Sequence, residues 1–96
     1  MNQFNIYIGA DNVSGKIDKA EIVRLLSSSF NGFTITLGCG FWQGKEEEVA
    51  IITIFTIRTR VELIYIVAEL CRKLRQDCII LQSVDQVDFV TGDSQN

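Results

Sequence analysis

The sequence predicts an α+β domain with the ferredoxin-like βαββαβ order, in which two helices cover one face of a four-stranded antiparallel sheet. The chain has 96 residues, which is the usual length of one domain. Segments with a two-residue apolar alternation and segments with helical spacing follow one another as strand, helix, strand, strand, helix, strand. Right-handed crossovers then place both helices on the same side of the sheet.

The first half of the chain starts with a strand and continues with a helix. Residues Phe4–Ile8 alternate apolar and polar side chains, as a half-buried strand does. Residues 9–15 read GADNVSG and are rich in turn formers. Asp18 is a candidate N-cap with Glu21 at the capping-box position, so we expect a helix from about Lys19 to Ser29.

The middle of the chain predicts a pair of strands around a polar turn. Phe33–Leu37 alternates and runs into a glycine-rich stretch, where Gly38 and Gly40 suggest a bulge. Residues 44–48 read GKEEE, which favours the turn itself. Val49–Phe55 is almost continuously apolar, which predicts a central strand buried on both faces.

A second helix follows, with Thr59 as N-cap and Glu62 at the capping-box position. We expect it to span Arg60–Arg75. Its apolar stripe is wider than one sheet face should need, because Leu63, Tyr65, Ile66 and Val67 widen it. This excess predicts a homo-oligomer that assembles through the second helix or through the open face of the sheet.

The C-terminal part predicts a last core strand at Cys78–Leu81. Residues 84–90 alternate again and either extend that strand or form a short edge strand. Residues 92–96 predict a flexible tail, which leaves one domain over residues 1–91. Cys71 and Cys78 fit small core residues.

Composition excludes several functions. The net charge of −3 and the pI of about 4.8 argue against general nucleic-acid binding, which needs a surplus of Lys and Arg. Three cysteines without CxxC spacing are a poor zinc site and a poor disulfide framework. The N-terminus has no signal-peptide pattern and no apolar run could span a bilayer. We therefore expect a cytoplasmic protein of a bacterium or a phage-infected cell, with no membrane, metal or cofactor.

Catalysis has little support in the residue types. The chain has no histidine, so no Ser-His or Cys-His pair can form. No sequence pattern pairs a carboxylate with Tyr7. The expectation is a protein that is not an enzyme and has no catalytic residues, although a small ferredoxin-like enzyme stays an alternative.

Four short motifs stand out along the chain: Tyr7-Ile8-Gly9, Phe30-Asn31-Gly32-Phe33-Thr34, the Gly-x-Gly-x-Trp-x-Gly stretch of residues 38–44, and Val87-Asp88-Phe89 near the end. Together they resemble a family of short bacterial and phage domains of unknown function. The resemblance covers nearly the whole chain. It implies the ferredoxin-like fold and no particular activity. Many members of the family look exported, and this chain departs from them because it has no signal-peptide pattern, which favours a cytoplasmic, phage-type role.

Six residues are candidates for binding a ligand. Trp42 and Tyr7 could stack on a ring, and the glycines beside Trp42 would let it approach the backbone. Arg58 and Arg60 flank the start of the second helix, where an anion is favoured. Asn12 and Lys16 lie in the first loop, which is either a solvated turn or an anion contact. Bulged-strand packing for Trp42 and solvated or salt-bridging roles for Arg58 and Arg60 are the structural alternatives.

These observations lead to a functional hypothesis. We expect a non-catalytic, oligomeric protein that binds a small anionic ligand, such as a nucleotide-derived signal. A phage counter-defence protein that sequesters such a signal would have this size and compartment. A protein-binding inhibitor or adaptor that acts through an acidic surface is the alternative.

Overall fold

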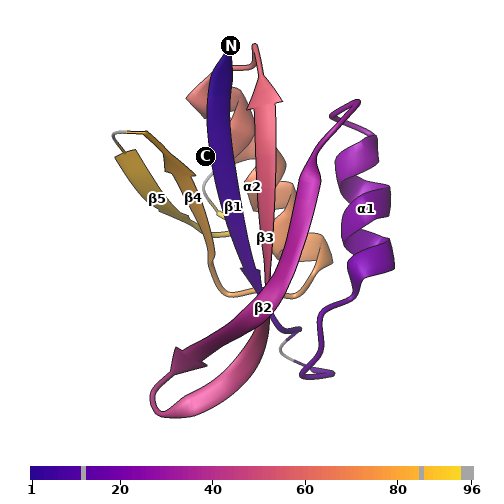
Figure 1. Ribbon diagram of the computed structural model, residues 1–96, viewed down its shortest axis with the longest axis vertical. Coiled ribbons are helices and arrows are strands. Elements are labelled where there is room, and N and C mark those ends of the chain that lie inside the picture. Colours follow the sequence, from indigo (N-terminus) through magenta and orange to yellow (C-terminus); the bar gives the residue numbers. More distant parts are fainter. Residues whose placement is uncertain (12, 85, 94–96) are drawn as a thin grey trace.

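The computed structural model describes residues 1–11, 13–84 and 86–93 and contains one antiparallel sheet with two helices (Figure 1). The sheet has five strands in the order β2-β3-β1-β4-β5. The first four keep the ferredoxin-like arrangement, and β5 is added beside β4. The prediction of four strands is therefore corrected, because residues 86–90 supply an edge strand of their own. The strands are β1 (Asn2–Gly9), β2 (Thr34–Trp42), β3 (Lys45–Thr56), β4 (Ile79–Ser83) and β5 (Gln86–Val90).

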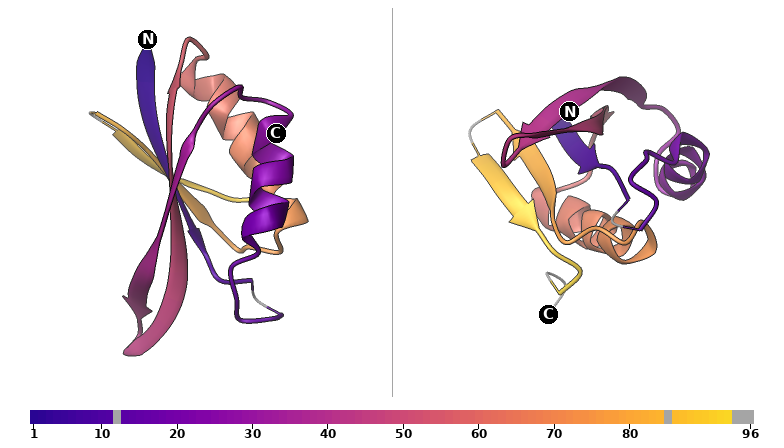
Figure 2. Two further views of the ribbon diagram at one scale, coloured as in Figure 1. Left: turned by 45° about the vertical axis from the view of Figure 1, so that its right-hand side comes forward. Right: turned by 90° about the horizontal axis from the view of Figure 1, so that it is seen from below.

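The helices α1 (Lys19–Ser27) and α2 (Arg60–Lys73) lie on the same side of the sheet, as Figure 2 shows in its left view. Asp18 caps α1 by accepting a hydrogen bond from the Glu21 N–H at 3.1 Å. At α2 the capping box is complete, because the Thr59 N–H also donates to Glu62 Oε1 at 3.0 Å. Both helices end two residues earlier than the sequence predicts.

The core lies between the helices and the covered face of the sheet. On the central strands β1 and β3, alternate side chains point into it, and they are fully or almost fully buried: Phe4, Ile6, Ile8, Ala50, Ile52 and Ile54. Their partners on α2 are Leu63, Val67, Ala68, Leu70 and Cys71.

This packing also accounts for most of the wide stripe on α2. Leu63 and Val67 are fully buried, and Ile66 packs partly buried against the same core. Tyr65 is 48% exposed. Self-association through α2 is therefore not needed to account for the wide stripe, since most of the excess apolar side chains pack within one chain.

The opposite face of the sheet carries no helix (Figure 2). Strand β3 is consequently buried on one face only, which corrects the prediction of burial on both. Val49 and Ile51 are half-buried there, and Phe55 is 62% exposed. Exposed Val87 and Phe89 of the added strand β5 lie on the same face, since Phe89 is opposite Ile80 and Ile80 is opposite Tyr7. We call this surface the open face.

The β2–β3 hairpin is regular along its whole length and extends past the helices (Figure 1). Its register runs from the pair Thr34 and Thr53 to the pair Trp42 and Lys45 without an extra residue. The predicted bulge at Gly38 and Gly40 is thus wrong. The turn lies at Gln43 and Gly44, whose φ angles are 52° and 79°. Two positive φ angles suit a two-residue hairpin turn. Residues 45–48 therefore belong to strand β3, which corrects the prediction that residues 44–48 form the turn.

The two predicted core cysteines differ in their burial. Cys78 is exposed and directly precedes β4, which corrects the prediction of a core residue. Cys71 is buried, as predicted. Within the described residues, neither helix is long and apolar enough to cross a membrane.

Candidate functional site

Three glycines lie close together on one patch of the open face. Gly9 and Gly38 lie on either side of Val49 in the sheet register, and Gly40 lies opposite Glu47. Added Cβ atoms at Gly38 and Gly40 would meet nothing closer than Val49 Cγ1 at 3.9 Å. A flat group could therefore lie directly on the backbone here. We call this surface the glycine platform, and it consists of Gly9, Gly38, Gly40, Trp42, Glu47 and Val49.

Strand alternation sorts the three consecutive glutamates onto different faces. Residues opposite each other in a ladder share a face, so Glu47 belongs with Gly40 on the open face. Glu46 and Glu48 point to the other side. Glu48 Oε1 accepts a hydrogen bond at 3.3 Å from the Ile17 N–H, which precedes α1. A hydrogen bond with Glu46 raises the pKa of the Cys39 thiol on that same side.

Trp42 and Lys45 form the outer end of the platform. They face each other across the last pair of the ladder, and Trp42 is 67% exposed. An indole that is mostly exposed on a rigid hairpin can stack on a planar ligand. The carboxylate of Glu47, two residues away along β3, adds a negative charge that can face a cation.

Tyr7 lies further along the same face, in a row with Ile51 on β3 and Ile80 on β4. Its hydroxyl donates a hydrogen bond of 2.6 Å to Gln82 Oε1. The next row is polar, and Thr53 Oγ1 donates to Asn5 Oδ1 at 2.9 Å. The open face thus has an apolar row beside the platform and a hydrogen-bonded polar row behind it.

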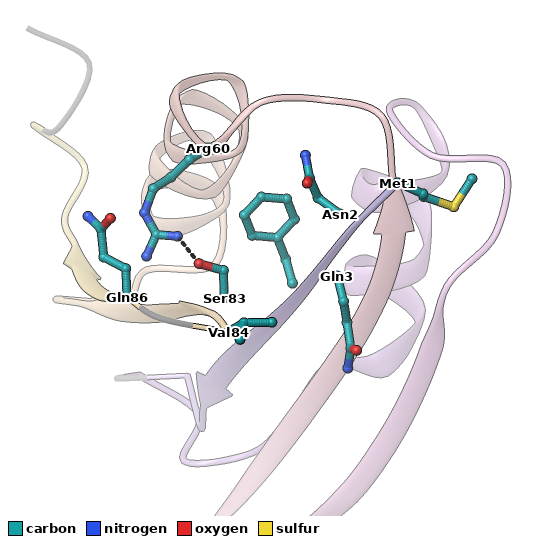
Figure 3. Close-up of a pocket in the computed structure, with 8 residues that line it drawn as sticks. Met1, Asn2, Gln3, Arg60, Ser83, Val84 and Gln86 are labelled. Atoms are coloured by element: carbon teal, nitrogen blue, oxygen red, sulfur yellow. Dashed lines mark hydrogen bonds between the residues drawn. The ribbon is translucent and has the colours of Figure 1, made fainter.

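A cavity of about 330 Å³ lies at the far end of the sheet (Figure 3). It is lined by residues 1–4, Arg60, Ser83, Val84 and Gln86, and we call it the Arg60 pocket. Arg60 Nη1 donates to Ser83 Oγ at 2.7 Å, and Nε lies 2.8 Å from Asp88 Oδ2. The guanidinium is mostly buried, with 19% of the side chain exposed. Arg60 therefore lines a polar pocket between α2, β1 and the β4–β5 edge.

Arg58 points to another part of the molecule. Its Nη2 donates to the Ser29 carbonyl at 3.1 Å, and its Nη1 lies 3.4 Å from Glu62 Oε2. The guanidinium also lies over the Phe30 ring, 5.6 Å from its centroid. These contacts tie α2 to the end of α1. The two arginines predicted to hold one phosphate are therefore not brought together.

The first loop is organised by Asp11. Its Oδ1 accepts hydrogen bonds from the Val13 and Ser14 N–H groups at 2.7 and 2.8 Å, and Oδ2 lies 2.8 Å from Arg75 Nη2. The Ser14 N–H and the Arg75 side chain lower the pKa of Asp11. Lys16 is exposed in this loop and its carbonyl accepts from the Asp11 N–H. Asn12 lies outside the described residues.

The predicted ligand residues therefore separate into groups. Trp42 and Tyr7 share the open face, whereas Arg60, Arg58 and Lys16 each lie in different surroundings. Sequence reasoning missed Glu47 and Gly9. The signal was present: a turn placed at Gln43-Gly44 makes Glu47 alternate onto the face of Trp42. The described residues also contain no group of three His, Cys, Asp or Glu side chains that could hold a metal ion.

Comparison with known proteins gives a fold relationship. No protein-family model matches the chain, and no curated protein matches it. Among solved structures, an apo phage SAM lyase superposes with a TM-score of 0.72 at 15% identity, over 95% of this chain and 89% of the other. A phage SAM lyase in complex with S-methyl-5'-thioadenosine gives a TM-score of 0.58 at 15% identity, over 93% and 88%.

These structures share the fold of the chain over nearly its full length, and both are enzymes. The expectation of a protein that is not an enzyme is thereby overturned. That expectation rested on the lack of histidine and of a paired nucleophile. Their lack argues against acid–base and nucleophilic catalysis by the protein, but not against a reaction in which the substrate supplies its own nucleophile.

Proposed function

We propose that this protein is a phage enzyme that cleaves S-adenosylmethionine (SAM) to S-methyl-5'-thioadenosine on the open face of its sheet. The observation that carries the proposal is the match to a phage SAM lyase over 95% of this chain, with a TM-score of 0.72. The glycine platform supports it, because its chemistry suits this substrate.

The platform offers a place for two parts of the substrate, the adenine ring and the positive sulfonium. Adenine is planar and can lie on the backbone of Gly38 and Gly40 with its edge or face against Trp42. Stacking on an aromatic side chain contributes about 1–3 kcal/mol per base. The positive sulfonium would then lie near the Glu47 carboxylate and the indole, which both attract cations. The expected anionic ligand is replaced in this proposal by a substrate with a cationic centre.

The reaction itself needs little from the protein. The substrate carboxylate can attack its own Cγ, the Cγ–S bond breaks, and sulfur keeps the electron pair. The products are the neutral thioether S-methyl-5'-thioadenosine and a lactone that keeps the ammonium charge. No proton is transferred, so a chain without histidine can promote the step. Its contribution is to hold the substrate in the bent conformation that brings the two reacting atoms together.

The direct test is to incubate the purified protein with SAM and to follow the products by liquid chromatography and proton NMR. We expect S-methyl-5'-thioadenosine and a lactone in equal amounts. Glu47→Gln should lower the rate at low SAM concentration at least tenfold, because the amide cannot neutralise the substrate cation. A tenfold loss corresponds to about 1.4 kcal/mol.

Glu46→Gln is the matched control, since Glu46 is the neighbour of Glu47 on the opposite face of the same strand. It should leave the rate within about twofold. If neither SAM cleavage nor SAM binding is found with a folded protein, the proposal is wrong. If the rate of SAM cleavage falls equally in the two variants, the protein is still a SAM-cleaving enzyme, but the glycine platform is not the site of the reaction.

We further propose that the protein self-associates through the open face in the cytoplasm of an infected cell. The surface exposes Phe55, Val87 and Phe89, which are 62, 47 and 70% exposed. Cleaving SAM would deprive methyl-dependent host defences of their methyl donor, which is the counter-defence role in this proposal. Sedimentation of the wild type and of Phe89→Ser tests the association: a monomeric wild type would contradict it.

A further inference from the structure

The Arg60 pocket is separate from the glycine platform and has a different chemistry. It lies at the end of the sheet where β1 begins and α2 starts, whereas the platform lies where β1 ends (Figure 1). Its volume of about 330 Å³ is at the lower end of the range of small-molecule pockets. A small metabolite would fit there.

The pocket holds a guanidinium whose hydrogen-bonding capacity is only partly used. Arg60 Nη1 is bound to Ser83 Oγ, and Nε faces Asp88. Nη2 is buried and finds no hydrogen-bond partner among the described residues. A buried guanidinium N–H without an acceptor is rare in folded proteins. An oxygen of a ligand in the adjoining cavity could supply one after a small rotation of the side chain.

Charge decides which ligand suits the pocket. Asp88 neutralises Arg60 at 2.8 Å, so a strongly anionic ligand such as a phosphate would lose much of its attraction. The other polar side chains that line the pocket are Ser83 and the neutral amides of Asn2, Gln3 and Gln86. This set favours a ligand with balanced charges over a simple anion.

The amide of Asn2 is oriented by the protein. Its Nδ2 donates to the Arg58 carbonyl at 3.1 Å, which turns its Oδ1 toward the cavity (Figure 3). An oriented acceptor of this kind suits an ammonium group. Phe4 and Val84 add apolar surface to the same cavity.

We propose that the Arg60 pocket binds a free α-amino acid with an apolar side chain. The carboxylate is held by the Arg60 guanidinium and Ser83, the ammonium by amide oxygens led by Asn2 Oδ1, and the side chain by Phe4 and Val84. This site is distinct from the platform and does not depend on the proposed lyase reaction.

The test is a titration of the full chain followed by ¹H–¹⁵N NMR with three probes. L-Methionine should shift the amide signals of Asn2, Ser83 and Gln86 saturably. L-Methioninamide lacks the carboxylate and should bind at least tenfold more weakly, and so should inorganic phosphate. Arg60→Lys keeps the charge beside Asp88 but loses the planar fork, so it should weaken L-methionine at least tenfold.

Arg58→Lys is the matched control, because Arg58 is two residues away and contacts Ser29 and Glu62 instead. It should leave the affinity within twofold. If Arg60→Lys does not fold, Ser83→Ala replaces it, with a loss of threefold or more. The proposal is overturned if L-methionine gives no saturable shifts, if phosphate or methioninamide binds as tightly, or if the Arg58 variant loses as much affinity as the Arg60 variant.

Discussion

The two faces of the sheet carry similar rows of large side chains at its centre, but the rows differ in how far they are buried. On the covered face, Ile6, Ile52 and Leu81 lie side by side in the register and are fully buried under the helices. On the open face, one residue further along, Ile51, Tyr7 and Ile80 form an equivalent row that is only half-buried. These two rows are therefore nearly equal in apolar character, and coverage by the helices is what separates them.

The difference shows which face is free to change. Alterations on the covered face must be accommodated by a close-packed core, so they act on stability. The open face has a patch without side chains at Gly38 and Gly40, and there an added side chain meets little of the protein. Substitutions at the platform should therefore act on ligands while the fold persists.

The largest expected effect separates the faces directly. Ile52→Ala removes a fully buried side chain, and the resulting cavity should lower the free energy of unfolding by about 2–5 kcal/mol. In the dissociated chain at low protein concentration, Ile51→Ala removes the same atoms from the half-buried open face and should cost about 1 kcal/mol or less. Urea unfolding of both variants measures the contrast. Similar losses would mean that something covers the open face in solution, and a loss for Ile51→Ala that grows with protein concentration would identify a second copy.

The next effect concerns binding without a change in fold. Gly40→Leu places a side chain on the platform, where no atom lies within 4 Å of the added Cβ. Stability should change by no more than about 1 kcal/mol, because the cost or gain is limited to strand propensity. Affinity for S-methyl-5'-thioadenosine, measured by calorimetry, should fall tenfold or more.

Gly32→Leu provides a control for the general effect of adding a leucine. Gly32 also has nothing within 4 Å of an added Cβ, and it lies in the connection before β2. The affinity of the Gly32→Leu variant for S-methyl-5'-thioadenosine should stay within twofold of the wild-type value. A Gly40 variant that binds normally would move the ligand away from the platform.

The contrast between the faces also explains what the sequence could predict. Order and type of the first four strands and both helices follow from apolar periodicity and capping residues, and Thr59 with Glu62 predicted the start of α2 to the residue. Periodicity could not settle residues 84–90, because a strand that continues and a strand that turns back have the same alternation.

The site was harder to predict because its residues lie in three strands. Gly9 is far from Gly40 and Glu47 in the sequence, and the three become neighbours only through the register. The register in turn depends on where the hairpin turns. The turn predicted from the sequence lies in residues 44–48 instead of at Gln43-Gly44. Glu47 is then a turn residue and is not assigned to a face of the sheet. Arg58 and Arg60 show the opposite error: they are close in sequence, but one contacts the end of α1 and the other faces β4 and β5.

The smallest expected effect lies where β1 leaves the sheet, next to the platform. Asp11 is held by the Val13 and Ser14 N–H groups and by Arg75, and these contacts lower its pKa from the ordinary value of 3.8. A carboxyl whose pKa is lower in the folded state stabilises the fold above its unfolded pKa. The stabilisation is lost as the pH falls below about 4 and through the lower folded value.

Asp11→Asn keeps an oxygen acceptor for the loop and removes the charge that pairs with Arg75. Its melting temperature at pH 7 should be lower than that of the wild type by about 2 °C, and the difference should shrink toward zero near pH 2. Arg75→Met removes the same pair from the other side and should give the same dependence. Binding of S-methyl-5'-thioadenosine at pH 7 should be unchanged in both variants, because the loop supplies stability and no platform residue. A parallel loss of binding would instead show that the loop fixes the position of Gly9, and the open face would then depend on the loop as the core depends on the helices.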